Sequence, residues 1–257
     1  MSHEDEYHDK LITLLEVIWG EGYMAPGGFG NVAKILKGTE PKSKRILDIG
    51  SGLGGPAFEM ATTHGATVVG VDLETGLIDR ANKRAEEKGL ADQCMFRQVE
   101  IGPYDFPDES FDIVVSSGAL TQTEDKEAIF RECYRILKPD GWISLYDWTK
   151  SDVPLSDDMR YWFKMEGLTF SLETLEKYKE RLENCGFLDV VTEDATDWYQ
   201  AEAHREIKLM KGELYDQTVE LIGQEETDLR IENWRAMIVV IDSGEMRQCY
   251  CKGQKPG

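Results

Sequence analysis

Apolar residues recur along the chain with two different periods. Near the start, Leu11, Leu14 and Ile18 follow helical spacing, which predicts an N-terminal helix. Glycine and proline residues within 20–30 end that pattern, and a short helix over 31–38 is expected to follow.

From residue 45 onward, short apolar runs alternate with amphipathic segments of helical period. This rhythm is typical of β-α-β units, which form a parallel sheet with helices on both faces. The predicted fold is therefore α/β, a Rossmann-like doubly wound sheet that is mostly parallel. The expected strands are 45–50, 67–72, 95–100, 111–118 and 141–148, and the expected helices between them are 54–65, 75–89 and 125–139.

The rhythm stops after residue 150, where longer and more polar segments begin. We expect helices within 151–180, a strand over 187–195, a long helix over 198–224, and an antiparallel pair of strands over 234–243 and 246–254. The chain then divides into N-terminal helices (1–44), an alternating α/β core (45–150), and an inserted helical cap that also completes the sheet (151–257).

Composition narrows the classes of protein. Hydrophobic residues make up 41% and charged residues 30% of the chain, without an apolar run long enough to span a membrane or a signal peptide's apolar stretch. Five scattered cysteines fit reduced thiols in a cytoplasmic protein. A net charge of −20 argues against nucleic acid and anionic membranes as partners. The spacing of His3, His8, His64 and His204 suggests no metal site, and the oligomeric state stays open between monomer and homo-oligomer.

A glycine-rich loop follows the first predicted strand. Gly50, Gly52 and Gly55 match the G-x-G-x-x-G pattern, and Asp72 ends the second strand 24 residues after Asp48. A carboxylate at that place can accept both hydrogen bonds of a ribose diol. The ligand is therefore a dinucleotide or an adenosine-containing sulfonium.

Motifs further along the chain favour one of these two ligand classes. The stretches DIGSGLG (48–54), FPDESFDIVVSSGAL (106–120) and LKPDG (137–141) occur in the order seen in class I S-adenosylmethionine-dependent methyltransferases, which the chain resembles. The resemblance implies S-adenosylmethionine as cofactor and a core that binds it.

The segment WGEGYMAPGG (19–28) resembles the lid of the phosphoethanolamine N-methyltransferase family, which closes over the cofactor. In that family the lid tyrosine works with a histidine that follows the fourth strand. The likeness implies that Tyr23 is the lid tyrosine, and it extends more weakly to the C-terminus. The expected cofactor-binding residues are Tyr23, Gly28, Asp48, Gly50, Gly52, Gly54, Asp72, Leu73, Glu100, Ile101, Ser116 and Ser117.

The chain differs from the family at the positions of the catalytic histidine and of the phosphate-binding side chains. Gln122 occupies the place of the histidine, and Leu168 is one of four residues that replace the phosphate-binding side chains. Glutamine cannot take a proton near neutral pH. A buried phosphate without cationic partners is heavily disfavoured. The expected catalytic residues are Tyr23 and Gln122, and the expected acceptor-binding residues are Trp19, Trp148, Tyr161, Trp162, Phe170 and Met237.

These substitutions favour a small unphosphorylated methyl acceptor. A thioether acid or an amine or amino acid would give a sulfonium or betaine-like product that aromatic faces stabilise. A carboxylate on such an acceptor would need a partner such as Arg160 or Arg235. The alternatives are a phosphoethanolamine-type N-methyltransferase, an NAD-dependent oxidoreductase and a non-catalytic cofactor-binding subunit.

Overall fold

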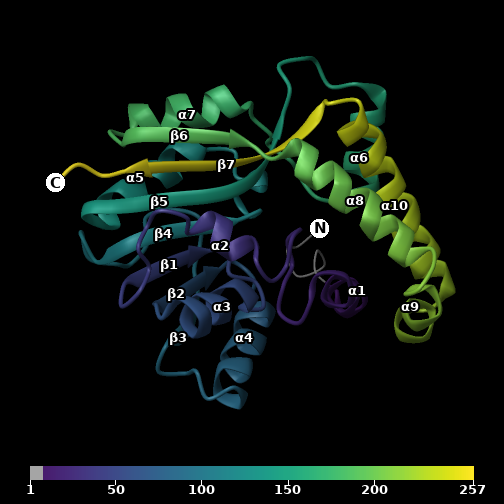
Figure 1. Cartoon of the computed structure of the whole chain (residues 1–257), viewed down its shortest axis with the longest axis horizontal. Helices are drawn as coiled ribbons and strands as arrows, with labels where there is room; N and C mark the ends of the chain where they lie inside the picture. The colour runs from purple at the N-terminus through teal and green to yellow at the C-terminus, as the bar shows by residue number, and fades with distance from the viewer. Residues whose placement is uncertain (1–7) are drawn as a thin grey trace.

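The computed structural model describes residues 8–257, and its centre is one seven-stranded sheet (Figure 1). The strand order is β3-β2-β1-β4-β5-β7-β6; β7 is antiparallel to both neighbours, and the other pairings are parallel. This order confirms the predicted doubly wound α/β fold. The strands are β1 (Arg45–Ile49), β2 (Thr67–Asp72), β3 (Cys94–Gln98), β4 (Phe111–Ser117), β5 (Leu137–Lys150), β6 (Leu188–Asp194) and β7 (Met246–Gln254).

One expected strand is a helix. The segment 234–243 belongs almost entirely to α10 (Gln224–Asp242), and the antiparallel neighbours of β7 are β5 and β6. The prediction was wrong because a short apolar run fits a buried helix as well as a buried strand. Along α10, Trp234, Met237 and Ile241 are buried at spacings of three and four residues, which places them on one helical face.

The long helix expected over 198–224 is instead two helices, α8 (Thr196–Met210) and α9 (Tyr215–Ile222). Gly212 lies in the turn between them. Glycine is among the poorest helix formers, which favours an interruption at this place.

Helices cover both faces of the sheet, as the alternation along β1 shows. Ile46 packs among residues of one face and Leu47 among residues of the other. The first face carries α2 (Asn31–Ile35), α3 (Gly55–His64) and α4 (Thr75–Glu87), and the second carries α5 (Lys126–Ile136) and α7 (Leu175–Asn184).

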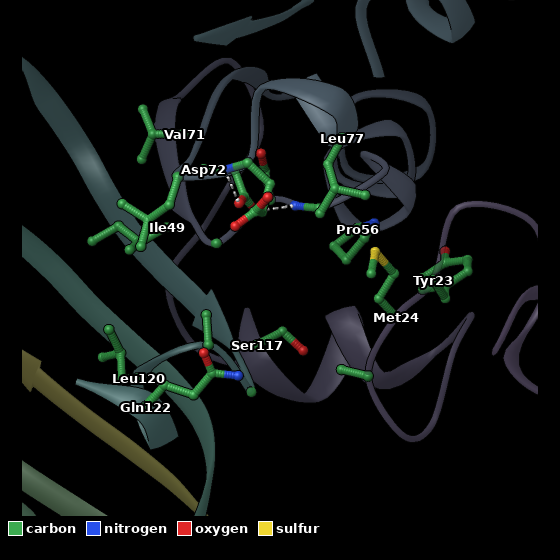
Figure 2. A pocket seen from close by; sticks show the side chains of 18 of the residues that line it. Tyr23, Met24, Ile49, Pro56, Val71, Asp72, Leu77, Ser117, Leu120 and Gln122 are labelled. Carbon is green, nitrogen blue, oxygen red and sulfur yellow. Dashed lines mark hydrogen bonds between the residues drawn. The ribbon is translucent and has the colours of Figure 1, made fainter. Parts of the chain in front are cut away.

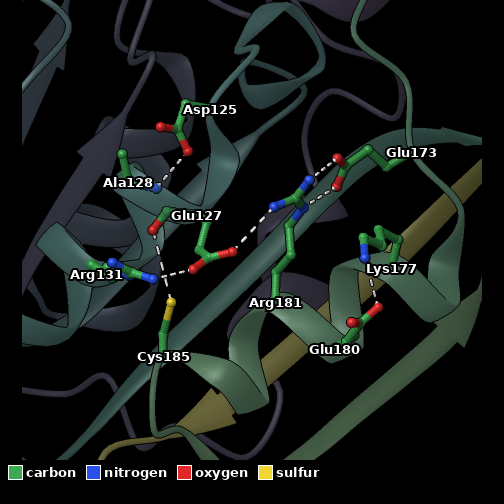
Figure 3. Close-up of polar contacts among 9 residues, drawn as sticks. All are labelled: Asp125, Glu127, Ala128, Arg131, Glu173, Lys177, Glu180, Arg181 and Cys185. Carbon is green, nitrogen blue, oxygen red and sulfur yellow. Dashed lines mark hydrogen bonds and ion pairs between the residues drawn. The ribbon is translucent and has the colours of Figure 1, made fainter.

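Ion pairs join α7 to the neighbouring parts of its face (Figure 3). The Arg181 guanidinium donates to both carboxylate oxygens of Glu173, at 2.6 and 2.7 Å, and to Glu127 of α5 at 3.4 Å. Asp125 is the N-cap residue of α5, and its carboxylate accepts the backbone N–H of Ala128 at 3.0 Å. The ion pairs therefore hold α7 to α5 and to Glu173, which comes just before α7.

A helical cap lies beyond one end of β5 and β7 (Figure 1). Helix α10 packs on α6 (Asp157–Glu166), α8 and α9, and α9 also packs on α1 (Asp9–Trp19). A shared apolar cluster includes Leu14, Trp162, Tyr199, Ile222 and Met237. The cap therefore combines the N-terminal helix with the segment after residue 150. Within residues 8–257, no helix has the length and apolar composition needed to cross a bilayer.

Candidate active site

The first cavity opens where the glycine loop follows β1 (Figure 2). Gly50 and Gly52 have φ values of +72° and +51°, a region that side chains other than glycine rarely adopt. A Cβ at Gly50 would lie 2.1 Å from Ala119 Cβ, and one at Gly52 would lie 2.9 Å from the Met24 sulfur. The loop is therefore packed between the lid segment and the loop after β4, as close backbone approach requires.

Asp72 holds this loop from the end of β2. Its carboxylate accepts the N–H of Gly52 at 2.8 Å and the N–H of Glu74 at 3.1 Å (Figure 2). Burial raises the pKa of Asp72, and the hydrogen bonds counteract that effect. A carboxylate accepts about four hydrogen bonds. Asp72 therefore keeps acceptor capacity toward the cavity that it lines.

Asp48 lies beneath the loop and does not line the cavity. It is 1% exposed, and its Oδ2 atom has no hydrogen-bond partner. Burial, together with the negative charge of Asp72, raises the pKa of Asp48 to about 7. Asp48 lies outside the cavity lining because it is the fourth residue of a buried strand, and its expected contact with the cofactor stays a prediction.

Eight of the expected cofactor-binding residues line the first cavity, which encloses about 1380 Å³ including its open mouth. They come from the lid, the glycine loop, and the ends of β2, β3 and β4. These residues are Tyr23, Gly28, Gly50, Gly52, Asp72, Leu73, Ile101 and Ser117.

Three further expected residues lie outside the lining. Gly54 begins α3, and a Cβ there would meet the rings of Phe96 and Phe58. Ser116 is buried in β4 and donates to the Ile49 carbonyl at 2.9 Å. Glu100 is exposed to solvent. The expected motifs therefore border the cavity, although not every expected residue lines it, and their contacts with a cofactor stay predictions.

Other lining residues were not expected from the sequence. Leu77, Val99 and Leu120 add apolar surface, and Asn31 adds a polar group from α2. Met24 and Pro26 follow the lid tyrosine, so the lid motif was the signal that indicated them.

Tyr23 and Gln122, the expected catalytic pair, are not brought together. The Tyr23 hydroxyl donates to Glu59 Oε2 of α3 at 2.6 Å. Burial and the Glu59 carboxylate raise the pKa of Tyr23. In Figure 2 the two side chains lie on different sides of the cavity. Tyr23 therefore fastens the lid in this structure, and a direct role for its hydroxyl in chemistry stays a prediction.

A second cavity adjoins the first, inside the helical cap. Met24, Ala25, Pro26, Gly118 and Gln122 line both cavities and mark their junction. Of the expected acceptor-binding residues, those that line the second cavity are Trp19, Trp148, Phe170 and Met237, together with Leu168. We call it the acceptor cavity.

Two expected acceptor-binding residues do not line this cavity. Trp162 stands one layer behind, with its ring centroid 5.3 Å from that of Trp148 and 4.9 Å from that of Phe170. Tyr161 faces outward, is 44% exposed and donates to Glu232 at 3.2 Å. Neighbouring residues of a helix point in different directions, so only one of this pair can face the interior.

A buried carboxylate supports the far wall of the acceptor cavity. Glu206 of α8 accepts the indole N–H of Trp19 at 2.6 Å and that of Trp234 at 3.0 Å. The two rings lie 5.9 Å apart, and both line the cavity. Burial raises the pKa of Glu206. No sequence pattern indicates this pairing, because the three residues come from different helices.

Gln122 lies in a short 3-10 helix that a buried lysine supports. Lys126 is 0% exposed, and its Nζ atom donates to the carbonyls of Thr123 at 2.7 Å and Ser171 at 2.6 Å. The Ser171 N–H in turn donates to the Thr121 carbonyl at 2.8 Å. These bonds join the loop that carries Gln122 to the segment that carries Phe170.

The charges around the acceptor cavity are negative. Within residues 8–257, neither cavity is lined by a lysine or arginine side chain, and Glu166 is the charged residue that lines the acceptor cavity. Arg160 and Arg235, expected as partners for an acceptor carboxylate, instead pair with Asp157 and Glu232 and lie outside the lining. Among the same residues, no group of three or more potential ligand side chains is arranged to hold a metal ion.

The first cavity fits an adenosine sulfonium. Asp72 provides acceptors for a ribose diol, and Leu73, Val99 and Ile101 provide apolar surface for a base. The glycine loop provides close backbone approach where a larger residue would not fit. The adjoining cavity gives space for a second small molecule next to the first cavity.

The comparisons with known proteins agree with this geometry. A methyltransferase domain model matches residues 47–145. The chain is 29% identical to a wheat (Triticum aestivum) phosphoethanolamine N-methyltransferase over 94% of its own length and 47% of that protein's. It is 31% identical to the Plasmodium falciparum phosphoethanolamine N-methyltransferase over 76% of its own length and 73% of that protein's. The chain spans about half the length of the curated plant relatives that it matches.

A solved structure of a similar protein includes bound ligands. Phosphoethanolamine N-methyltransferase 2 of Haemonchus contortus, in complex with phosphomonomethylethanolamine and S-adenosylhomocysteine, superposes with a TM-score of 0.92 at 26% identity. The match covers 98% of this chain and 59% of the other. A second structure of the same protein is in complex with S-adenosyl-L-methionine, the cofactor that the sequence motifs of this chain indicate. The chain belongs to the phosphoethanolamine N-methyltransferase family, within the class I S-adenosylmethionine-dependent methyltransferases.

Proposed function

We propose that the chain transfers a methyl group to the nitrogen or sulfur of a small, unphosphorylated acceptor and releases a cationic product. One observation carries the proposal: within residues 8–257, no lysine or arginine side chain lines either cavity, whereas aromatic rings surround the acceptor cavity. The rings are those of Trp19, Trp148, Phe170, Tyr199 and Trp234.

The lining is unfavourable for a phosphate. A phosphate dianion that leaves water needs charge-assisted hydrogen bonds to offset its lost hydration. Leu168 and Phe170 have no hydrogen-bond donor, and Trp148 offers one uncharged indole N–H, so none of the three brings a positive charge to a phosphate. The Glu166 carboxylate would repel it. Discrimination against phosphobases therefore follows from the chemistry of these side chains.

The residues of this chain bind the cofactor and orient the acceptor. S-adenosylmethionine, when bound, supplies an electrophilic methyl group on a sulfonium. Asp72 and the glycine loop hold its nucleoside part, and the segment from Tyr23 to Pro26 covers the cavity and excludes water. Gln122, at the junction of the cavities, orients the acceptor by hydrogen bonding.

Gln122 also limits which nucleophiles are suitable. A thioether reacts through a sulfur lone pair and loses no proton, so the absence of a basic side chain costs nothing. An amine must arrive neutral, and glutamine cannot accept its proton. Both products are cations, which the faces of tryptophan and tyrosine stabilise.

A phosphoethanolamine-type activity is the second candidate. Family membership supports it, as does the Haemonchus contortus relative in complex with phosphomonomethylethanolamine. The lining of the acceptor cavity argues against it, because nothing there neutralises a phosphate.

Release of S-adenosylhomocysteine from a panel of acceptors decides between them. The panel holds phosphoethanolamine, phosphomonomethylethanolamine, 2-dimethylaminoethanol, dimethylglycine and 4-methylthio-2-hydroxybutyrate. We expect turnover with an unphosphorylated member and none with the phosphobases, and the Gly52→Val variant serves as the inactive control. Turnover of the phosphobases alone would overturn the proposal, and no turnover on any acceptor would favour a non-catalytic subunit.

The pH profile of the active acceptor then identifies the nucleophile. A thioether predicts a rate that is nearly flat between pH 6 and 9, whereas an amine predicts a rate that rises as the amine deprotonates.

A further inference from the structure

One carboxylate inside the acceptor cavity has no part in the mechanism above. Glu166 is the last residue of α6 and lines the acceptor cavity but not the cofactor cavity. It is separate from Gln122, which lines both. An elongated acceptor with its reacting atom at the junction would therefore reach Glu166 with its other end.

Glu166 and Asn233 form a pair that offers hydrogen-bond acceptors. Asn233 donates from Nδ2 to Glu166 Oε2 at 2.5 Å. The Asn233 side-chain oxygen has no hydrogen-bond partner, although Asn233 is 2% exposed and lines the cavity. A buried acceptor without a donor is costly, and a ligand that donates a hydrogen bond would remove this cost.

The position of Glu166 is unfavourable for a negative charge. The C-terminal end of a helix carries a partial negative charge, which repels a carboxylate in the last turn. Burial further disfavours the charged form and raises the pKa of Glu166. Arg230 is a nearby cation, but it pairs with Glu226 at 2.7 Å and does not line the cavity. A positively charged ligand would stabilise the Glu166 carboxylate.

The walls around this pair also favour a cation. Trp19, Trp234 and Tyr199 line the same cavity, and the buried Glu206 accepts hydrogen bonds from both indoles. Polarised indole rings attract cations through their faces. One carboxylate, Glu166, and several aromatic rings therefore line a space that no lysine or arginine within residues 8–257 lines, and the Glu206 carboxylate bonds two of these rings from outside the lining.

We propose that the acceptor carries, besides the atom that is methylated, a protonated amine that donates hydrogen bonds to Glu166 and Asn233. The inference rests on the proposed function and names its substrate class: a cationic amine without an acidic group, such as an amino thioether or a diamine. For a thioether, the sulfur lone pair forms the new S–CH₃ bond as the methyl–sulfur bond of the cofactor breaks. S-adenosylhomocysteine leaves as a neutral thioether, and no proton moves.

Three thioethers with different tails test the inference. They are 3-(methylthio)propylamine, 3-(methylthio)propan-1-ol and 3-(methylthio)propionate, whose tails are cationic, neutral and anionic. Their binding to protein saturated with S-adenosylhomocysteine is measured by calorimetry. We expect the amine to bind at least tenfold more tightly than the propionate, with the alcohol between them. This series needs only the unaltered chain.

The Glu166→Gln variant tests whether the preference for a cationic tail arises from Glu166. We expect this variant to weaken binding of the amine at least tenfold and to change binding of the alcohol less than threefold. Glu225→Gln, which removes the same charge from an exposed position on α10, is the matched control and should leave both affinities unchanged. A propionate that binds as tightly as the amine, an amine that does not bind, or an amine indifferent to Glu166→Gln would each overturn the inference.

These outcomes are separate from those of the proposed function. Turnover of an unphosphorylated carboxylate, with weak binding of the amine, would leave the proposed function intact and remove this inference. Turnover of phosphobases alone would contradict the proposed function itself, whatever the tail series shows.

Discussion

The hydroxyl of Tyr23 donates a hydrogen bond of 2.6 Å to Glu59, and the same carboxylate accepts the backbone N–H of Gly30 at 3.2 and 3.3 Å. One side chain of α3 therefore fastens both ends of the lid segment 23–30. The lid is held over the cofactor cavity from the core and not from the acceptor cavity.

Tyr23→Phe should therefore act mainly on cofactor binding. Loss of the hydroxyl removes the shorter of the two donors to the Glu59 carboxylate and leaves the Gly30 N–H, at a cost of about 1–3 kcal/mol. We expect S-adenosylhomocysteine to bind roughly fivefold to a hundredfold more weakly, as measured by calorimetry. Tyr215→Phe removes an exposed hydroxyl that also donates to a carboxylate, and it is the matched control. Unchanged cofactor affinity with a tenfold fall in kcat would show instead that the hydroxyl takes part in the chemistry.

Asp72→Ala should weaken cofactor binding more strongly. The change removes the expected ribose partner and also the acceptor that holds the Gly52 N–H. We expect a loss of roughly 2–4 kcal/mol in the binding of S-adenosylhomocysteine. Asp79→Ala, at an exposed position on the following helix, should have no effect. An affinity within a factor of three of the unaltered chain would contradict the assignment.

The sequence was sufficient for the fold because the chain order of strands and helices determines how parallel units can wind. The prediction of secondary structure was wrong where a local pattern fits both a strand and a helix. Residues 234–243 are apolar enough for a strand, and only the tertiary packing of α10 on α6 and α8 selects the helix.

The candidate site was predictable where a motif is contiguous in the chain. The glycine loop and Asp72 are of this kind. The Glu166–Asn233 pair and the support of Trp19 by Glu206 join residues far apart in the sequence. No spacing rule reaches across such distances, so these contacts emerged only from the structure.

Asp48 should make the stability of the protein depend on pH. Burial and the charge of Asp72 raise its folded-state pKa to about 7 from the ordinary value of 3.8. The folded protein therefore holds this proton between those pH values while the unfolded chain has lost it. The stabilisation is full below pH 3.8 and is lost as pH rises toward 7. Asp48→Asn cannot ionise and should not show this loss.

Urea unfolding of the unaltered chain and of Asp48→Asn between pH 5 and 8.5 measures the difference in their free energies of unfolding. We expect the free energy of unfolding of Asp48→Asn, relative to the unaltered chain, to increase from pH 5 to about 7 and then stay constant. Asp79→Asn should show no such trend. A difference that is independent of pH would mean that Asp48 is not the titrating group.

Trp148→Ala should separate acceptor binding from cofactor binding. The Trp148 ring stacks on Phe170 at 6.0 Å with an interplanar angle of 10°, and it lines only the acceptor cavity. Its loss removes both apolar contact and a face that stabilises the cationic product. We expect the KM of the acceptor to rise at least tenfold, while the Kd of S-adenosylhomocysteine changes less than threefold.

Truncation of a tryptophan that is 9% exposed also costs stability, about 3–5 kcal/mol, so Trp148→Phe provides a milder variant. Phenylalanine keeps an aromatic face but presents a weaker one to a cation. The KM of the acceptor should therefore rise in the order Trp, Phe, Ala, with unfolding midpoints measured beside it to confirm that each variant is folded. If the acceptor KM stays constant while both variants bind S-adenosylhomocysteine more weakly, Trp148 serves the cofactor cavity, and the acceptor cavity lies elsewhere.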